Sequence, residues 1–384
     1  MKRFVSFGLP VLVLALSLAL ISCGGNGAGD DNVNAEHFTA TAETFGEILD
    51  SIRLTPGNYI ITLTSDLLDF PGVRLYTAGV NITVRGDVAS RRLSWQRTTD
   101  APALFRVDSG SRLTLENITL NRAAGDTPAW ALLAMQGGTI EMRSGVTVSN
   151  NDGTIISESV RVGDSSTFIM SGGVIENSRF AIAIPGPGAS VTISGGTIRN
   201  NEEYGVTIWG SQNTVNMSGG TISGNGRIGV IAWGGSQNTV NMSGGEIIGN
   251  FHNGAVVGND EGANAGNRFN MSGGRISNNS NNGMVVSHGG SFIMSGGSIS
   301  GSGNFGLFLE GGNAHFEKRI GATIYGNDAA ANSNAELAIL VWTSSLHPDN
   351  RVLFRTARAN EVFAATRNAD NSGLVPGSAQ GDWD

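Results

Sequence analysis

The sequence contains little cysteine, proline, lysine or charge of either sign. Its one cysteine, Cys23, has no partner for an intramolecular disulfide. Nine prolines among 384 residues are too few for collagen or for a proline-rich linker. Charged residues make up 15% of the chain, against about 25% in typical soluble domains. This composition argues against a disordered polyelectrolyte.

The charge balance and the histidines exclude further classes of partner. The formal net charge is −8, and lysine occurs only at Lys2 and Lys318. Nucleic-acid binding needs a basic surface facing the phosphates, so we expect no nucleic-acid partner. The five histidines show no metal-ligand spacing, and no phosphate loop or nucleophile elbow lies in the context that it needs. We expect no metal and no other cofactor.

Residues 1–22 have the organisation of an export signal. Lys2 and Arg3 form a basic start, and a mainly apolar run follows up to Cys23. The run is shorter than the roughly 20 apolar residues that span a bilayer, and it has the proportions of a signal peptide. The junction LISC, which ends at Cys23, resembles the lipobox of bacterial lipoproteins.

The resemblance to lipoproteins implies cleavage before Cys23, which would then carry lipid on its sulfur and on the new amino terminus. The membrane would be a partner through Cys23, and the bacterial cell envelope would be the location. Gly24 follows the cysteine and no Asp stands beside it, so resemblance to lipoproteins that are sorted onward implies the outer membrane. The residues leave an uncleaved anchor with an incidental cysteine as the alternative.

The remaining chain changes composition several times. A Gly- and Asn-rich stretch after the cysteine has almost nothing to bury and indicates a flexible tether. Phe45, Leu49 and Ile52 then recur at helical spacing, before Pro56 and Gly57 end the pattern. The predicted division is 1–22 signal peptide, 23–38 lipidated cysteine and tether, 39–58 capping helix, 59–327 parallel β-helix, 328–367 closing strands and 368–384 loose tail.

A repeated Ser-Gly-Gly unit dominates the middle of the chain, which is rich in glycine, with 56 residues in all. Successive units are separated by 23, 24, 25, 29 and 23 residues. Self-similarity at such a period is typical of a solenoid. The serines that open the units are Ser171, Ser194, Ser218, Ser243, Ser272 and Ser295.

Apolar residues around each unit recur at a spacing of two, which places their side chains on one face of a strand. One such pair precedes each serine, an isoleucine follows it by four residues, and a third apolar pair closes the repeat. The turn residues argue against helical repeats, and the period is too short for a propeller blade. We predict an all-β fold, a parallel β-helix with three short strands per coil of about 23–25 residues. The isoleucines are Ile175, Ile198, Ile222, Ile247, Ile276 and Ile299.

A small polar residue stands seven positions after each serine, as in Asn201, Asn225 and Asn250. These side chains can hydrogen-bond to the turns above and below and tolerate a left-handed backbone, so we interpret the column as structural.

The unit Ser-Gly-Gly-x-Ile-x-x-Asn, between Phe105 and Asn327, resembles repeats of right-handed β-helix proteins in the pectate-lyase-like superfold, including bacterial surface lipoproteins. Enzymes of that superfold cleave polysaccharides, with calcium-binding Asp clusters and a basic residue in the lyases or paired carboxylates in the hydrolases. One superfold hosts many activities, so the resemblance implies the fold and leaves the function open.

Carboxylates do not recur at one repeat position, which argues against a catalytic cluster built by stacking. Glu202-Glu203 and Asp260-Glu261 are adjacent pairs, but they fall in turns of different coils at different repeat positions. We therefore expect a binding, adhesion or structural surface without catalysis. A polysaccharide lyase or glycoside hydrolase with an unrecognised carboxylate site remains the alternative.

Two features mark a candidate ligand or partner site. Trp209 and Trp233 occupy the same position in adjacent coils and are expected to point outward, about 5 Å apart. The other feature is an insertion between two strands that carries Asp260 and Glu261, since insertions in solenoids often lie on the binding face. A glycan or a host or envelope protein is the expected ligand, although duplication of the coil also explains the paired tryptophans.

A column of mostly apolar residues is predicted on the outside of the same strands. Exposed apolar columns mark contact sites unless another segment covers them. The C-terminal strands are the candidate cover. The column comprises Thr207, Ile231, Val256, Val285 and Phe308.

Overall fold

The structure of the chain is a computed structural model. It describes residues 34–88, 91–95, 103–122, 130–149, 158–259, 266–310, 314–318, 322–324, 337–342, 351–354, 363–367 and 374–376. The expected signal peptide, Cys23 and most of the expected tether lie outside these residues. No helix within the described ranges is long and apolar enough to cross a membrane.

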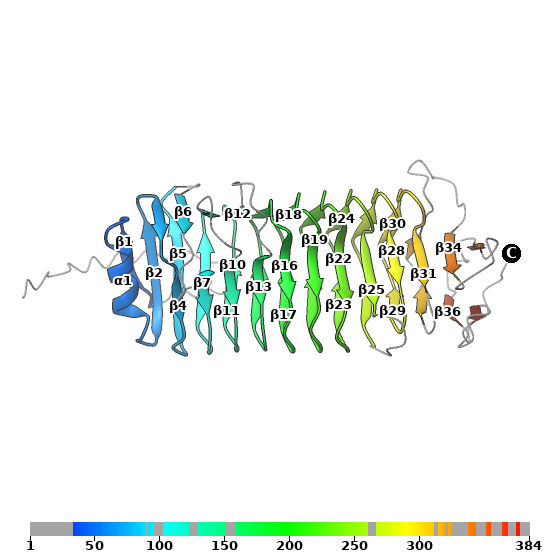
Figure 1. Cartoon of the computed structure of the whole chain (residues 1–384), viewed down its shortest axis with the longest axis horizontal. Helices are drawn as coiled ribbons and strands as arrows, with labels where there is room; N and C mark the ends of the chain where they lie inside the picture. Colours follow the sequence, from blue (N-terminus) through cyan, green and yellow to red (C-terminus); the bar gives the residue numbers. More distant parts are fainter. Residues whose placement is uncertain are drawn as a thin grey trace, which may run out of the picture. The chain divides into compact units, whose positions relative to one another are not determined.

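Short strands follow one another along the chain and stack in three sheets (Figure 1). We call them sheets A, B and C. Sheet A has the order β1 (Glu36–Ala40), β2 (Gly57–Leu63), β5 (Val80–Gly86), β8 (Arg112–Glu116), β11 (Thr139–Met142), β14 (Thr167–Met170), β17 (Ser190–Ile193), β20 (Thr214–Met217), β23 (Thr239–Met242), β26 (Arg268–Met271), β29 (Ser291–Met294), β32 (His315–Lys318), β36 (Phe363–Arg367) and β37 (Leu374–Pro376).

The other two sheets run beside sheet A. Sheet B has the order β3 (Leu67–Phe70), β6 (Arg91–Trp95), β9 (Ile118–Arg122), β12 (Thr147–Ser149), β15 (Val174–Glu176), β18 (Thr197–Arg199), β21 (Thr221–Ser223), β24 (Glu246–Ile248), β27 (Arg275–Ser277), β30 (Ser298–Ser300) and β33 (Thr323–Ile324). Sheet C has the order β4 (Val73–Leu75), β7 (Ala103–Val107), β10 (Trp130–Ala134), β13 (Glu158–Val162), β16 (Phe180–Ile184), β19 (Tyr204–Ile208), β22 (Ile228–Trp233), β25 (Ala255–Gly258), β28 (Met284–Val286), β31 (Leu307–Glu310), β34 (Leu337–Trp342) and β35 (Arg351–Phe354).

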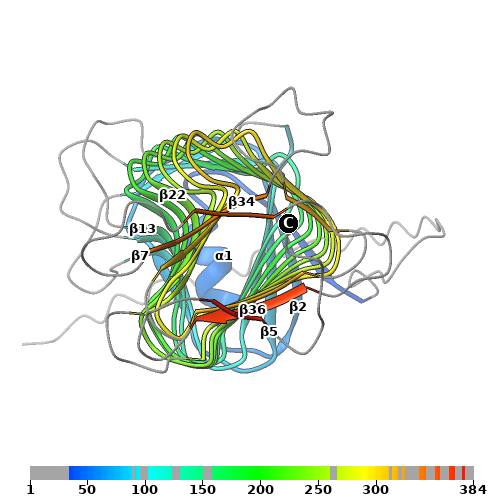
Figure 2. The same ribbon diagram turned by 90° about the vertical axis from the view of Figure 1, so that its right-hand side faces the viewer.

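Each coil contributes one strand to each sheet, and like positions of successive coils pair in parallel. Thr167 pairs with Ser190, which pairs with Thr214, so the spacing of 23 and 24 residues in the sequence becomes one strand step. Ile198, Ile222 and Ile247 also pair in register, and each is 1% exposed. Figure 2 shows the strands of each sheet behind one another around this interior. The predicted parallel β-helix with three strands per coil is confirmed.

The Ser-Gly-Gly turns need glycine for two separate reasons. The second glycine has a positive φ, as at Gly220 with φ 78°, where a Cβ is costly. The first glycine passes close to the coil below, because a Cβ on Gly195 would lie 2.4 Å from the carbonyl oxygen of Ser171. Both positions of the unit therefore require glycine in the stacked coils.

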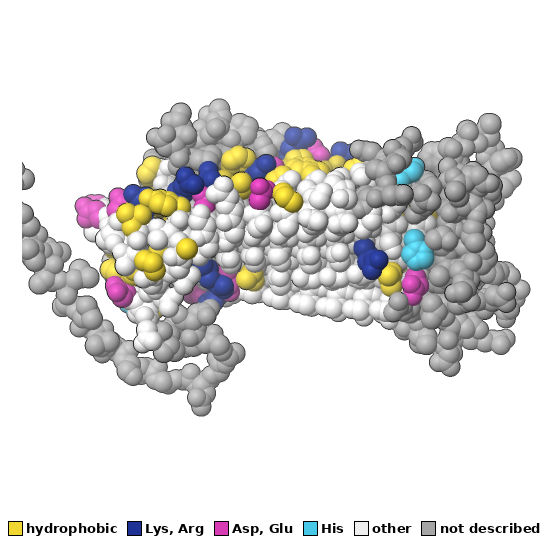
Figure 3. All heavy atoms as spheres, turned by 90° about the horizontal axis from the view of Figure 1, so that it is seen from below, with side chains coloured by type: hydrophobic (Ala, Val, Ile, Leu, Met, Phe, Trp, Pro, Cys, Tyr) yellow, Lys and Arg dark blue, Asp and Glu magenta, His cyan; other side chains and the backbone are white. Residues whose placement is uncertain are grey.

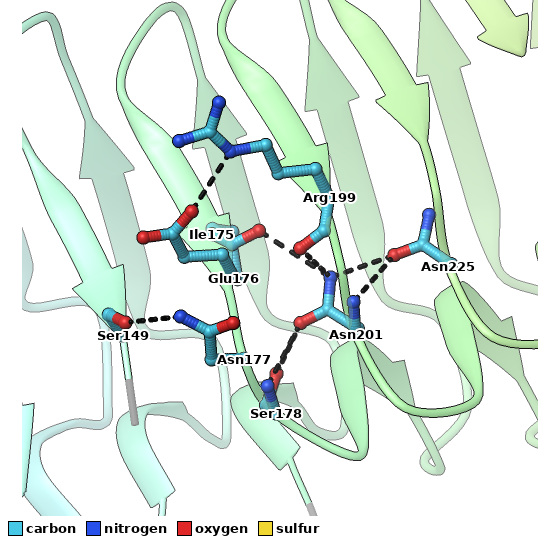
Figure 4. A network of polar contacts seen from close by, with 8 residues as sticks. All are labelled: Ser149, Ile175, Glu176, Asn177, Ser178, Arg199, Asn201 and Asn225. Carbon is cyan, nitrogen blue, oxygen red and sulfur yellow. Dashed lines mark hydrogen bonds and ion pairs between the residues drawn. The ribbon is translucent and has the colours of Figure 1, made fainter. Parts of the chain in front are cut away.

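The asparagine column is a buried ladder of side-chain hydrogen bonds (Figure 4). The Nδ2 of Asn201 donates to the Oδ1 of Asn225 at 2.9 Å, and Asn225 donates to Asn250 in the same way at 2.9 Å. The structural interpretation of this column is confirmed. The left-handed backbone, however, lies one residue earlier, for example at Asn200 with φ 54°.

Both ends differ in detail from the sequence-based expectation. Strand β1 pairs with β2 in parallel within residues expected to form the end of the tether and the start of the helix. Helix α1 (Phe45–Ile52) follows it and is shorter than expected, with Phe45, Leu49 and Ile52 buried and Phe45 edge-on to Phe70. At the other end, strand β37 forms within the expected loose tail by pairing antiparallel to β36.

Candidate binding surface on sheet C

The outer face of sheet C changes character along the stack. Its central outer column begins with arginines in the first coils and becomes apolar from β22 onward. Strand alternation turns Val206 and Ile208 into the interior and Thr207 outward. The column, followed through the strand register, comprises Arg74, Arg106, Leu133, Arg161, Ala183, Thr207, Ile231, Val256, Val285 and Phe308.

In the first coils, the arginines of this column hold buried carboxylates. Arg74 and Arg106 both contact Asp108, at 2.7 and 2.9 Å, and the Asp108 side chain is fully buried. Two coils later, Arg161 contacts Glu158 at 2.9 Å. These carboxylates satisfy the hydrogen-bonding groups of the arginines, which makes them structural ion pairs.

An aromatic cluster of Phe180, Tyr204 and Trp209 follows on the outside of β16 and β19. Phe180 and Tyr204 stack with ring centroids 5.3 Å apart and an interplanar angle of 11°. Trp209 meets the Phe180 ring edge-on, at 5.2 Å and 86°. The Phe180 and Tyr204 rings therefore each cover one face of the other, while Trp209 remains 37% exposed.

Arginines close the cluster on the turn side. The guanidinium of Arg179 lies 4.9 Å from the Phe180 ring, and that of Arg227 lies 5.5 Å from the Tyr204 ring. Glu203 joins the two arginines, at 2.8 Å from Arg179 and 3.5 Å from Arg227. The hydrogen bond that Arg179 donates to Glu203 raises the pKa of Arg179, and burial raises the pKa of the Tyr204 phenol. The cluster is therefore held in one arrangement by stacking and charge together.

The two tryptophans predicted from the sequence lie at equivalent positions, since Ile208 pairs with Ala232 in the strand register. Their surroundings differ. Trp209 leans on Phe180, whereas Trp233 is half-buried and packs against the apolar group around Ile231. Asp260 and Glu261, the other predicted site residues, lie outside the described residues.

The apolar part of the outer column is covered in the folded chain. Ile231, Val256 and Val285 are only 8%, 5% and 4% exposed. The described C-terminal strands do not provide the cover proposed from the sequence, because β34 extends sheet C beside β31, with Phe308 paired to Leu340, and β36 and β37 extend sheet A. Thr207 is fully buried, and its hydroxyl has no hydrogen-bond partner in the described part of the chain.

A second group of ion pairs lies on the outside of sheet A and includes Glu141, which is 7% exposed. Burial raises the pKa of Glu141, but hydrogen bonds from Arg143 and Arg112 outweigh it and hold the pKa below its ordinary value. A general acid needs the opposite shift. Within the described ranges, no three His, Cys, Asp or Glu residues come together as metal ligands.

Comparison with known proteins agrees with the architecture. Residues 130–299 match the family described as right handed beta helix region. The chain contains a right-handed β-helix domain. This agrees with the superfold that the Ser-Gly-Gly repeat resembles. No curated protein matches the chain.

A solved structure resembles the chain at a low level. Its title is the crystal structure of the periplasmic alginate epimerase AlgG. The identity is 14%, the match covers 75% of this chain and 83% of that chain, and the TM-score is 0.32. Similarity at this level transfers neither activity nor substrate.

The sequence pattern missed most of the aromatic cluster. Phe180, Tyr204 and Ile228 share one repeat position but differ in type, so they formed no recognisable column. The sequence pattern also did not indicate the arginines of the cluster. Charge alternation from coil to coil, Arg179 then Glu203 then Arg227, was the pattern that could have indicated them.

Proposed function

We propose that this protein is a lipid-anchored envelope protein that binds a saccharide on the outer face of sheet C, at Trp209, without catalysing a reaction. The observation that carries the proposal is the exposed indole of Trp209 on an otherwise closed aromatic cluster. Exposed aromatic side chains backed by a rigid support are typical of ligand and partner contacts.

The rigidity of the support favours binding. The Phe180 ring fixes Trp209 from one side, and Tyr204 in turn fixes Phe180. A side chain held in place before the ligand arrives loses little conformational freedom on binding. A sugar ring can lay its C–H face against the indole, while the neighbouring guanidinium of Arg179 offers hydrogen bonds to its hydroxyls.

Three carboxylates at sheet C favour binding over hydrolysis. Asp108, Glu158 and Glu203 are each held by arginine, at distances of 2.7–2.9 Å. Hydrolysis needs one carboxylic acid that holds its proton near neutral pH beside a second, ionised carboxylate. A glycoside hydrolase would have to use groups outside this set.

The anchor rests on the sequence. The junction that ends at Cys23 has the lipobox pattern, and a Gly- and Asn-rich segment separates it from β1. We propose that the lipid attaches the protein to the outer membrane, where the outer face of sheet C binds saccharides.

The binding test uses the chain with Cys23→Ser on an array of glycans and envelope proteins. We expect glycan binding by the parent and its loss in Trp209→Ala. Phe251→Ala is the matched control, because Phe251 is an aromatic residue on a turn and is 68% exposed. Equal binding by all three proteins would remove the site from Trp209. Binding to proteins alone would mean that the ligand is a protein and not a saccharide.

A further inference from the structure

The outer face of sheet A carries a regular array of small uncharged polar side chains, which we call the polar array. It consists of two adjacent columns on β14, β17, β20, β23 and β26. Figure 3, seen from below, shows a broad uncharged area between two groups of charged side chains. One column contains Thr167, Ser190, Thr214 and Thr239, and the other contains Thr192, Asn216, Asn241 and Asn270.

The array is periodic in two directions. Along the stack, neighbouring side chains are one strand step apart, about 4.8 Å. Along each strand, positions such as Thr214 and Asn216 are two residues apart, about 6.6–6.8 Å. Four consecutive coils keep this register without a bulge, from Thr167 to Thr239. All eight side chains are half-buried, so they form a level surface rather than flexible projections.

The backbone and several side chains are fixed before any ligand arrives. Behind the array, Val191, Val215 and Val240 are buried in the core. On the surface, Asn241 donates to Asn216 at 2.9 Å, and Asn270 donates to Asn241 at 2.9 Å. Each amide still has a second N–H and a second acceptor position for a partner.

Charge is confined to the borders of the array. On one side, Arg143 and Arg112 hold Glu141 at 2.6 and 2.5 Å. On the other side, Arg268 takes the place of the next threonine. The equivalent outer face of sheet B contrasts with this, because ion pairs such as Glu176 with Arg199 and Glu246 with Arg275 interrupt its threonines.

We propose that the polar array binds the surface of ice. The array is uncharged and repeats in two dimensions, and a surface that matches it has the same two properties. Ice presents rows of water oxygens whose two perpendicular repeats on its prism faces are of similar length to the strand step and the two-residue step. Hydroxyl and amide groups can donate to and accept from these oxygens, and the threonine methyl groups exclude loosely held water.

The neutrality of the array is the feature that favours ice over a charged ligand. A charged group keeps its own strongly held hydration shell, which does not fit an ice lattice. Individual contacts to water are weak, so affinity must come from many contacts made together on a rigid surface. The array lies on a different sheet from Trp209, and this inference does not depend on the proposed saccharide site.

The test measures incorporation of the Cys23→Ser chain into slowly growing ice, together with inhibition of ice recrystallisation. The variant Thr214→Tyr/Thr239→Tyr places two large side chains on the array. The control Thr197→Tyr/Thr221→Tyr makes the same changes in sheet B, where both threonines face outward and are half-buried. Circular dichroism and thermal unfolding confirm that each variant is folded.

We expect the parent and the sheet B variant to enter ice and to slow recrystallisation, and the sheet A variant to lose both effects. Exclusion of the folded parent from ice would overturn the proposal. Equal loss in both variants would overturn it as well. If the parent binds an insoluble neutral polysaccharide through the array and is excluded from ice, the polysaccharide takes the place of ice.

Discussion

Asn225 donates a hydrogen bond from its side-chain Nδ2 to the Oδ1 of Asn250 at 2.9 Å, although 25 residues separate them in the chain. Both residues are fully buried. Asn225 also accepts from the backbone N–H and the side chain of Asn201. One amide therefore joins three successive coils, and the whole ladder depends on each member.

Replacing Asn225 with Ala should destabilise the β-helix by about 1–3 kcal/mol, because the buried amide groups of Asn201 lose their acceptor. The measurement is the free energy of urea-induced unfolding. Asn216→Ala is the matched control on the outer face of sheet A, where water can replace the lost partner. Equal destabilisation by the two changes would contradict the distinction between buried and surface ladders.

Gly220→Ala should destabilise by at least about 1–2 kcal/mol, the cost of a left-handed backbone for a residue with a Cβ. The new Cβ would also lie 2.9 Å from the carbonyl oxygen of Gly195. Gly46→Ala serves as a control of opposite sign, since Gly46 lies in α1 with open space around its Cβ position. It should stabilise by about 0.5–1 kcal/mol. Thermal unfolding of both variants gives the comparison.

Acidification between pH 7 and pH 5 should weaken the fold through His252. Burial and the charge of Arg227 lower the pKa of this imidazole below its ordinary value of 6.5. The unfolded chain therefore takes up the proton first as the pH falls, and stability is lost from about the unfolded pKa down to the folded pKa. The neutral ring can also accept from Asn281 at 3.2 Å, and protonation removes that acceptor.

The measurement is unfolding free energy against pH for the parent and His252→Gln. We expect a smaller loss between pH 7 and pH 5 in the variant. His315 contributes loss of the same sign, because burial lowers its pKa too, so the variant should retain part of the slope. Identical slopes in the parent and the variant would contradict a contribution of His252 to the loss of stability between pH 7 and pH 5.

Cys23→Ser should move the protein from the membrane fraction to the soluble fraction of the expressing bacterium, because lipidation at this residue is the proposed attachment. Incorporation of a labelled fatty acid checks the modification directly. If the variant still incorporates the labelled fatty acid, the lipid is attached at another residue. If the parent incorporates none, the anchor is the uncleaved N-terminal segment.

The repeating part of the fold was predictable because its physics is periodic. Ile198, Ile222 and Ile247 recur with every coil, and each must face the interior for the stack to bury its core. The ends were less predictable. Strand β1 and strand β37 follow no repeat, and their pairing depends on the edge that the finished stack offers.

The candidate site was predictable only at its outermost residue. Trp209 was found because Trp233 repeats it one coil later, yet the partner that orients it is Phe180, a residue of another coil with no counterpart in the pattern. Ion pairs such as Arg179 with Glu203 also join different coils. Contacts of this kind depend on side-chain reach across the stack, which residue spacing does not define.

The central claim is that Trp209 contacts a saccharide on the outside of sheet C. The most direct measurement is the affinity of the Cys23→Ser chain for its strongest array glycan, determined by calorimetry for the parent, Trp209→Ala and Phe251→Ala. We predict at least about tenfold weaker binding in Trp209→Ala, equivalent to 1.4 kcal/mol, and parental affinity in Phe251→Ala. Equal affinity in the parent and Trp209→Ala would contradict the claim.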